Sequence, residues 1–115
     1  MPLNTETLVA ILDTLNQEVV FVDNDHIIRF MNLEAKRHYH DRSGYSNLIG
    51  KSIFDCHNGV SNQLIKDVHA RMVKGEDEIF PNEEKLTYSM VAVRDEKGEL
   101  LGYFERDVNT KGEGL

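Results

Sequence analysis

The most constraining feature of this sequence is one long amphipathic helix, predicted over residues 60–74, with extended segments on both sides of it. Its apolar positions fall on one face, whereas the positions between them are polar or charged. The apolar face consists of Leu64, Ile65, Val68 and Met72. A helix of this kind buries one face, so the extended segments before and after it must provide the surface that covers this face.

Two helices and two strands are predicted before residue 42. A first helix begins near Asn4 or Thr5, because leucine and isoleucine recur there at helical spacing. These residues are Leu8, Ile11, Leu12 and Leu15. A short apolar run at 18–22 is rich in β-branched residues, and a turn at 23–25 joins it to a second extended segment at 26–31. Asn32 then predicts the start of a short helix.

Three further extended segments follow the long helix, at residues 78–80, 86–94 and 100–108. Pro81 confines the first of them to a sheet edge, because proline cannot donate a ladder hydrogen bond. Gly98 permits the tight turn that joins the other two as a hairpin. Two strands, helices and then three strands predict an α+β domain, in which a five-stranded antiparallel sheet carries its helices on one face.

These segments carry five short motifs that together resemble a PAS domain. They are the strand and turn at 19–23, Met-Asn-Leu-Glu-Ala at 31–35, Gly-Tyr-Ser-Asn-Leu-Ile-Gly-Lys-Ser at 44–52, the hairpin at 95–102 and Arg-Asp-Val at 106–108. They occur in the order in which that family has them. The resemblance implies the strand order 2-1-5-4-3, with the long helix across one face of the sheet.

The resemblance also implies a domain division and a function. Residues 1–16 are expected to form an N-terminal amphipathic cap or dimerisation helix, 17–109 the PAS domain and 110–115 a frayed tail. The expected function is that of a bacterial-type sensory or regulatory module in signal transduction. Such a module binds a small ligand or haem between the sheet and the long helix and signals through dimerisation or a partner protein. The alternative is a ligand-free module for dimerisation or protein interaction.

The first helix predicts a homodimer. Its apolar stripe of Leu8, Ile11, Leu12 and Leu15 lies outside the PAS core as the family usually builds it. An apolar stripe needs a cover, supplied either by the outer face of its own sheet or by a second copy of the chain.

Composition excludes several classes of partner and activity. The chain has 20 acidic and 13 basic residues, a net charge of -7 and no basic cluster, so no direct nucleic-acid or membrane partner is expected. The single cysteine and the lack of an apolar run of ~20 residues indicate a cytoplasmic protein. No nucleophile elbow, phosphate loop or HExxH motif occurs, so an enzyme is not expected.

Cofactor-binding residues are predicted between the sheet and the long helix. This set comprises Phe30, Ile65, Val68, Met72, Tyr88, Met90 and Phe104. Apolar side chains from a sheet face and an amphipathic helix would enclose a cavity suited to a small molecule. A collapsed core built from the same side chains is the alternative.

Two residues in the loop entering the long helix, Cys56 and His57, are predicted at the rim of this space. A neutral imidazole there would ligate haem iron, so His57 is the candidate metal ligand. The alternative is a buried thiol followed by a turn. His69 is a further candidate cofactor-binding residue. The alternative, favoured by its position roughly 100° around the helix from Val68, is a solvated or partly packed side chain. The surroundings of Cys56 match neither the flavin nor the coumaroyl photoreceptors of the family, so neither chromophore is expected.

Overall fold

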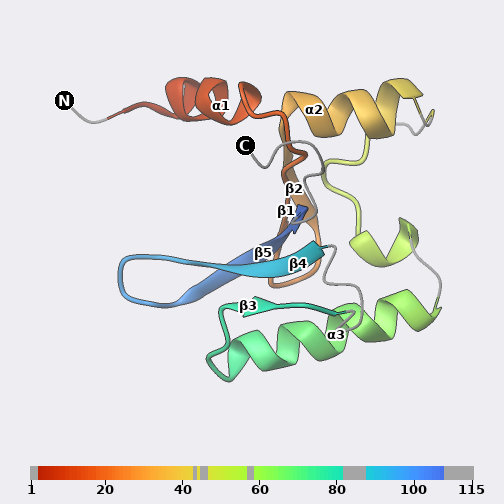
Figure 1. Ribbon diagram of the computed structural model, residues 1–115, viewed down its shortest axis with the longest axis vertical. Helices are drawn as coiled ribbons and strands as arrows, with labels where there is room; N and C mark the ends of the chain where they lie inside the picture. The colour runs from red at the N-terminus through yellow and green to blue at the C-terminus, as the bar shows by residue number, and fades with distance from the viewer. Residues whose placement is uncertain (1–2, 43, 45–46, 57–58, 82–87, 108–115) are drawn as a thin grey trace.

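The structure is a computed structural model that describes residues 3–42, 44, 47–56, 59–81 and 88–107. Figure 1 shows the arrangement of its elements. In chain order they are helix α1 (Thr5–Asp13), strands β1 (Val20–Asp23) and β2 (Ile28–Met31), helix α2 (Leu33–Lys36), the π-helix η1 (Arg37–Arg42), the 3-10 helix η2 (Ile53–Cys56), helix α3 (Gly59–Val73) and strands β3 (Glu78–Ile79), β4 (Tyr88–Arg94) and β5 (Leu100–Asp107).

The five strands form one antiparallel sheet in the order β2-β1-β5-β4-β3. The predicted fold class and strand order are thereby confirmed. Strand β1 lies between β2 and β5, because Phe21 lies opposite Phe30 on β2 and opposite Phe104 on β5. Gly98, with φ +82°, takes the left-handed conformation that the turn between β4 and β5 requires.

One apolar core lies between the sheet and the helices α2, η1, η2 and α3. Its buried members are Val22, Ile28, Met31, Ala35, Leu48, Ile65, Val68, Met72, Ile79, Met90 and Tyr103. Helix α3 contributes Ile65, Val68 and Met72 at spacings of three and four, which place them on one face. Leu64, predicted on the same face, is 37% exposed, because it precedes Ile65 by about 100° around the helix axis.

The side chain of Asn32 joins the first helix, the sheet and α2. Its Oδ1 accepts hydrogen bonds from the backbone N–H groups of Val19, at 2.9 Å, and Ala35, at 3.0 Å. Its Nδ2 donates to the carbonyl oxygens of Leu12, at 3.0 Å, and Gln17, at 2.9 Å. Asn32 is therefore the predicted N-cap of α2, and it is fully buried with both ends of its amide satisfied.

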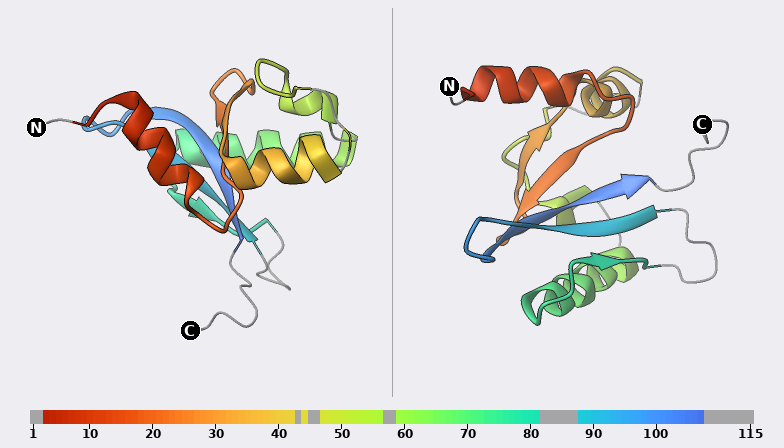
Figure 2. Two further views of the ribbon diagram at one scale, coloured as in Figure 1. Left: turned by 90° about the horizontal axis from the view of Figure 1, so that it is seen from above. Right: turned by 60° about the vertical axis from the view of Figure 1, so that its left-hand side comes forward.

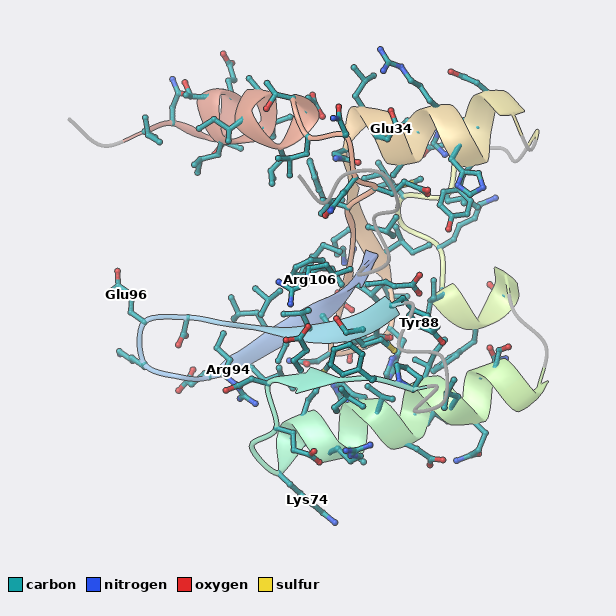
Figure 3. The ribbon with its side chains drawn as sticks, viewed as in Figure 1. Glu34, Lys74, Tyr88, Arg94, Glu96 and Arg106 are labelled. Atoms are coloured by element: carbon teal, nitrogen blue, oxygen red, sulfur yellow. The ribbon has the colours of Figure 1, made fainter. Side chains whose placement is uncertain are left out.

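Arg94 fastens the C-terminal end of α3 to the sheet. Its Nη2 donates to the carbonyl oxygen of Met72 at 2.7 Å and to that of Glu76 at 3.2 Å. Its Nε pairs with Asp77 at 2.7 Å. Figure 3 shows Arg94 on the β4–β5 hairpin, close to the connection between α3 and β3. A helix C-terminus attracts a cation because its last carbonyls lack partners within the helix, so this contact caps α3.

Helix α1 begins at the predicted cap, where Asn4 accepts a hydrogen bond from the backbone N–H of Thr7 at 2.8 Å. It buries none of its residues, and Leu8 and Ile11 are 48% and 49% exposed. Leu15, predicted on the same helix, lies beyond its end at Asp13 and is 43% exposed. Figures 1 and 2 show α1 and α3 on opposite sides of the β4–β5 hairpin. The apolar stripe of α1 thus lies outside the core.

No described helix has the length and apolar character needed to cross a membrane. The predicted tail at 110–115 lies outside the described residues.

Candidate functional site

Five of the seven side chains predicted to line a binding site lie together. Ile65, Val68 and Met72 of α3 and Met90 of β4 are buried in the one core, and Tyr88 packs against them. Figure 3 labels Tyr88 at the start of β4. Their use as ligand contacts stays a prediction.

Phe30 and Phe104 do not belong to this set, which corrects the sequence-based interpretation. Both lie opposite Phe21, and Phe104 also lies opposite Val91. Directly paired residues of neighbouring strands point to the same face of a sheet, whereas Met90, next to Val91, points to the other. Phe30 and Phe104 therefore lie on the outer face, and both are half-buried.

A β-bulge explains the change of face in β2. The register shifts between Phe21 and Val22, so that Val22 pairs with Ile28 while Phe21 pairs with Phe30. Ile28 and Met31 are consequently both buried although they are three residues apart. Strict alternation from Ile28 would have placed Phe30 inward, but the extra residue of the bulge turns it outward.

Of the two predicted rim residues, Cys56 ends η2, just before α3. His57 lies outside the described residues. Its role as an iron ligand therefore stays a prediction.

The structure instead brings together a polar cluster at the boundary between α3 and the sheet. The ring of His26, from the β1–β2 turn, lies 4.7 Å from that of His69 on α3, centroid to centroid, in an edge-on arrangement. Phe54 of η2 lies 4.7 Å from His26, and Tyr103 of β5 lies 5.8 Å from it. We call these four side chains, with Asn24, the His26–His69 cluster.

Hydrogen bonds fix both imidazole rings. The Nδ1 of His26 shares a hydrogen bond of 2.8 Å with the hydroxyl of Tyr103. Asn24 donates its Nδ2 to the carbonyl oxygen of Leu100 at 2.7 Å, so its Oδ1 must face His69. The Nε2 of His69 lies 3.0 Å from this oxygen and donates to it, since an amide oxygen only accepts. The turn, α3 and β5 are thus joined through two imidazoles.

The backbone of His26 is strained. Its φ of +64° is the left-handed conformation, and no other described residue except glycine has a positive φ. The backbone N–H of His26 donates to the carbonyl of Asp23 at 2.9 Å, and that of Asp23 to the carbonyl of Ile27 at 3.0 Å. This pattern is a three-residue hairpin loop whose last position favours glycine. A histidine there costs about 1–2 kcal/mol.

Burial sets the protonation of the cluster. It lowers the pKa of His26 below its ordinary value, and a charge on His69 lowers this pKa further, while Asp23 and Asp25 oppose the shift. Burial also lowers the pKa of His69 and raises that of Tyr103. At neutral pH the cluster therefore contains two neutral imidazoles and a protonated phenol.

The described residues form no cluster of metal ligands. Among them, no three His, Cys, Asp or Glu side chains lie close enough together to hold an ion. Each described histidine ring has a hydrogen-bond partner: His26 with Tyr103, His38 with Glu18, His40 with the backbone N–H of Leu48 and His69 with Asn24. Each of these bonds engages one ring nitrogen of its imidazole, and a histidine that ligates a metal commonly hydrogen-bonds through its other nitrogen, so these bonds do not decide between His57 and the described histidines as an iron ligand.

Comparisons with known proteins give a family and a fold. The family model described as PAS domain matches residues 8–109. None of the curated proteins matches the sequence. A C-terminal domain from Streptococcus mutans is 23% identical with a TM-score of 0.70, and 94% of this chain and 91% of that chain are covered. The PAS domain of a protein from Colwellia psychrerythraea is 16% identical with a TM-score of 0.62, covering 90% and 95%.

A third solved structure, the Aer2 receptor from Vibrio cholerae, is described as a dual PAS-heme oxygen sensor. It is 20% identical with a TM-score of 0.51, and 80% of this chain and 94% of that chain are covered. At these identities the structures show a shared fold.

Proposed function

Because the chain belongs to the PAS domain family, we propose that it is a cytoplasmic sensory module of signal transduction that catalyses no reaction itself. Relatives with this domain are sensory modules in signal transduction. The observation that carries the proposal is the His26–His69 cluster, a set of polar, titratable side chains between α3 and the sheet. The hydrogen bonds among these groups offset the cost of placing them at the edge of an apolar core, so the cluster links α3, the β1–β2 turn and β5 through groups that can change protonation.

The signal we propose is a small ligand or haem held between the sheet and α3. The apolar side chains of Ile65, Val68 and Met72 face the sheet there, next to the cluster. A ligand in this place would contact the helix and the sheet at once. It would therefore change the distance between them, which is the movement that a partner could detect.

Haem is tested by adding haemin to the purified protein and recording the absorption spectrum. If haem is the cofactor, a Soret band forms, the variant His57→Ala shifts or removes it, and His69→Ala leaves it in place. His69→Ala serves as the matched control because it also removes an imidazole but leaves His57 in place. No Soret band in the unchanged protein would exclude haem, and native mass spectrometry of the purified protein would then identify a small organic ligand by its mass.

The proposed output is a homodimer formed through α1 and the residues that follow it. Leu8 and Ile11 of α1 and Leu15 just beyond its end expose about half of their surface, and the outer face of the sheet adds the half-buried side chains of Phe21 and Phe104. Exposed apolar surfaces of this kind are commonly covered by a second copy or another protein. The dimer couples to the sensor because Leu12, at the end of α1, is bonded to the buried Asn32.

Sedimentation velocity at tens of micromolar should show a dimer, and the double variant Leu8→Gln, Ile11→Gln should raise its Kd roughly 100-fold or more. Four half-exposed side chains would be lost per dimer, at about 1 kcal/mol each. The matched control is Leu64→Gln on α3, a residue of similar exposure outside this surface. A monomeric protein, or a double variant with an unchanged Kd, would contradict the dimer.

A ligand-free interaction module is the second candidate. The observation in its favour is that inner-face side chains of the sheet and those of α3 form one cluster of packed residues. Under this reading the dimer forms as above, and no small molecule accompanies the protein in native mass spectra.

A further inference from the structure

The identity of residue 26 is the first argument for a role of the His26–His69 cluster beyond packing. Glycine or asparagine would adopt the left-handed backbone of this loop more easily than histidine does. The imidazole is nevertheless placed there, and its Nδ1 reaches the hydroxyl of Tyr103. A strained residue whose side chain makes specific contacts indicates a function for that side chain.

The second argument is the set of charges that face the two rings. Lys66 of α3 lies with its Nζ 5.2 Å from the centre of the Phe54 ring, and its charge disfavours a proton on His26. Asp23 and Asp25 favour such a proton, but Asp23 is already paired with Arg29 at 2.7 Å. Strand β5 contributes the phenol of Tyr103 to the cluster, and burial keeps this phenol protonated. Two imidazolium ions in contact would therefore lack a free, buried counter-ion among the described groups.

We propose that His26 and His69 form a proton-operated latch between the β1–β2 turn and α3. While both rings are neutral they remain in contact and hold α3 against the turn. When both carry a proton, two like charges about 4.7 Å apart repel each other and open this contact. The latch opens and closes without a ligand. It rests on the proposed sensory function in one respect, namely that a partner detects the position of α3 as the signal.

The direction of the pH dependence follows from the lowered pKa values of both imidazoles. In the open form these groups take up protons near pH 6.5, about the ordinary value for histidine. In the closed form they resist protonation until lower pH. The closed form is therefore fully stable above about pH 6.5 and loses stability as the pH falls from there through the lowered pKa values.

The test measures amide hydrogen exchange by NMR at pH 7.5 and 5.0 and low salt, corrected for intrinsic exchange rates. Protection of amides in α3 around His69 and in the turn at His26 should fall at least roughly fourfold, the effect of two unit charges at this separation even at the dielectric constant of water. Protection in the β4–β5 hairpin should fall less.

Two variants remove the latch while keeping the local backbone. His26→Asn retains a residue that accepts the left-handed conformation, and His69→Gln retains a donor for Asn24. Each should remove the repulsion between the two rings and so reduce the pH-dependent loss of protection, the remainder being due to the buried imidazole that is left. The matched control His38→Gln changes a histidine that pairs with Glu18 on the surface, so it should leave this loss intact.

An unchanged pH response in His26→Asn and His69→Gln would overturn the latch, as would a response that His38→Gln removes equally. A pH response that is equal in all parts of the fold would also overturn it, because it would indicate global acid unfolding. Failure to detect haem or another ligand would count against the proposed ligand signal. It would not contradict the latch, because the latch requires no ligand.

Discussion

Replacing Asn32 with alanine should lower the free energy of unfolding by roughly 3 kcal/mol and the melting temperature by about 15 °C. The buried amide makes four hydrogen bonds, and its loss leaves two N–H groups and two carbonyls without these partners. Each unsatisfied buried group costs about 1–3 kcal/mol, and water recovers part of this cost where the chain is half-exposed. Stabilities of small domains are about 5–15 kcal/mol, so this loss is a large share of the total.

Urea denaturation of Asn32→Ala measures this loss, and Asn4→Ala is the matched control. Both asparagines are N-caps, but Asn4 is exposed and its side chain accepts a hydrogen bond from Thr7 alone. Its replacement should cost about 1 kcal/mol or less. Equal losses in the two variants would show that Asn32 acts as a helix cap alone and does not join α1 to the sheet.

Replacing Gly102 with alanine should lower the free energy of unfolding by about 4 kcal/mol or more. A Cβ atom at this position would meet the carbonyl oxygen of Val22, far inside contact distance, and would lie 2.9 Å from the Cα of Asp23. Both atoms belong to the backbone of β1, which pairs with β5 at this point. A backbone cannot turn away as a side chain can, so the two strands must separate.

Circular dichroism at increasing urea concentrations measures the effect, with Gly98→Ala as the control in the same hairpin. Gly98 has a φ of +82°, and a Cβ atom added to it would meet nothing within 4 Å, so alanine there encounters backbone strain without a clash. Its cost should be about 1–2 kcal/mol. A loss at Gly102 no larger than that at Gly98 would mean that β1 and β5 accommodate a methyl group.

The order of the elements could be predicted from the sequence because each one carries a local signal. The caps at Asn4 and Asn32, the turn at Gly98 and the spacing of Ile65, Val68 and Met72 each act within a few residues. The strand order follows from the family resemblance, and it brings five side chains of the predicted site together.

The face of the sheet on which Phe30 and Phe104 lie could not be predicted from local signals of this kind. Alternation along β2 predicts an inward Phe30, and the bulge beside it reverses that prediction. In β5, Tyr103 and Phe104 are adjacent aromatic residues of similar size, and alternation alone does not say which of them faces the core. Tyr103 is the buried one, and pairing with Val22 decides this, which is a contact between distant parts of the chain.

The His26–His69 cluster escapes prediction for a related reason. The sequence pattern makes His26 the first residue of a strand and His69 a solvated or partly packed position on α3. The run Asp23-Asn24-Asp25-His26 does contain a signal, since Asp and Asn favour a three-residue loop that would place residue 26 in the left-handed conformation. No local pattern, however, indicates that α3 lies beside this loop.

The Arg94 contact at the end of α3 gives this helix a fixed pivot. A guanidinium stays charged at every pH at which the protein is folded, so its bond to the Met72 carbonyl does not open with the histidines. His69 lies three residues from Met72, and Gly59, the first residue of α3, lies thirteen residues away. At a rise of about 1.5 Å per residue, the distance along the helix from Met72 to Gly59 is roughly four times the distance from Met72 to His69. For a rigid helix turning about Met72, a displacement of about 1 Å at His69 would correspond to about 4 Å at Gly59, opposed by the buried side chains of Ile65 and Val68 and by the hydrogen bond from Asn62 to the Phe54 carbonyl.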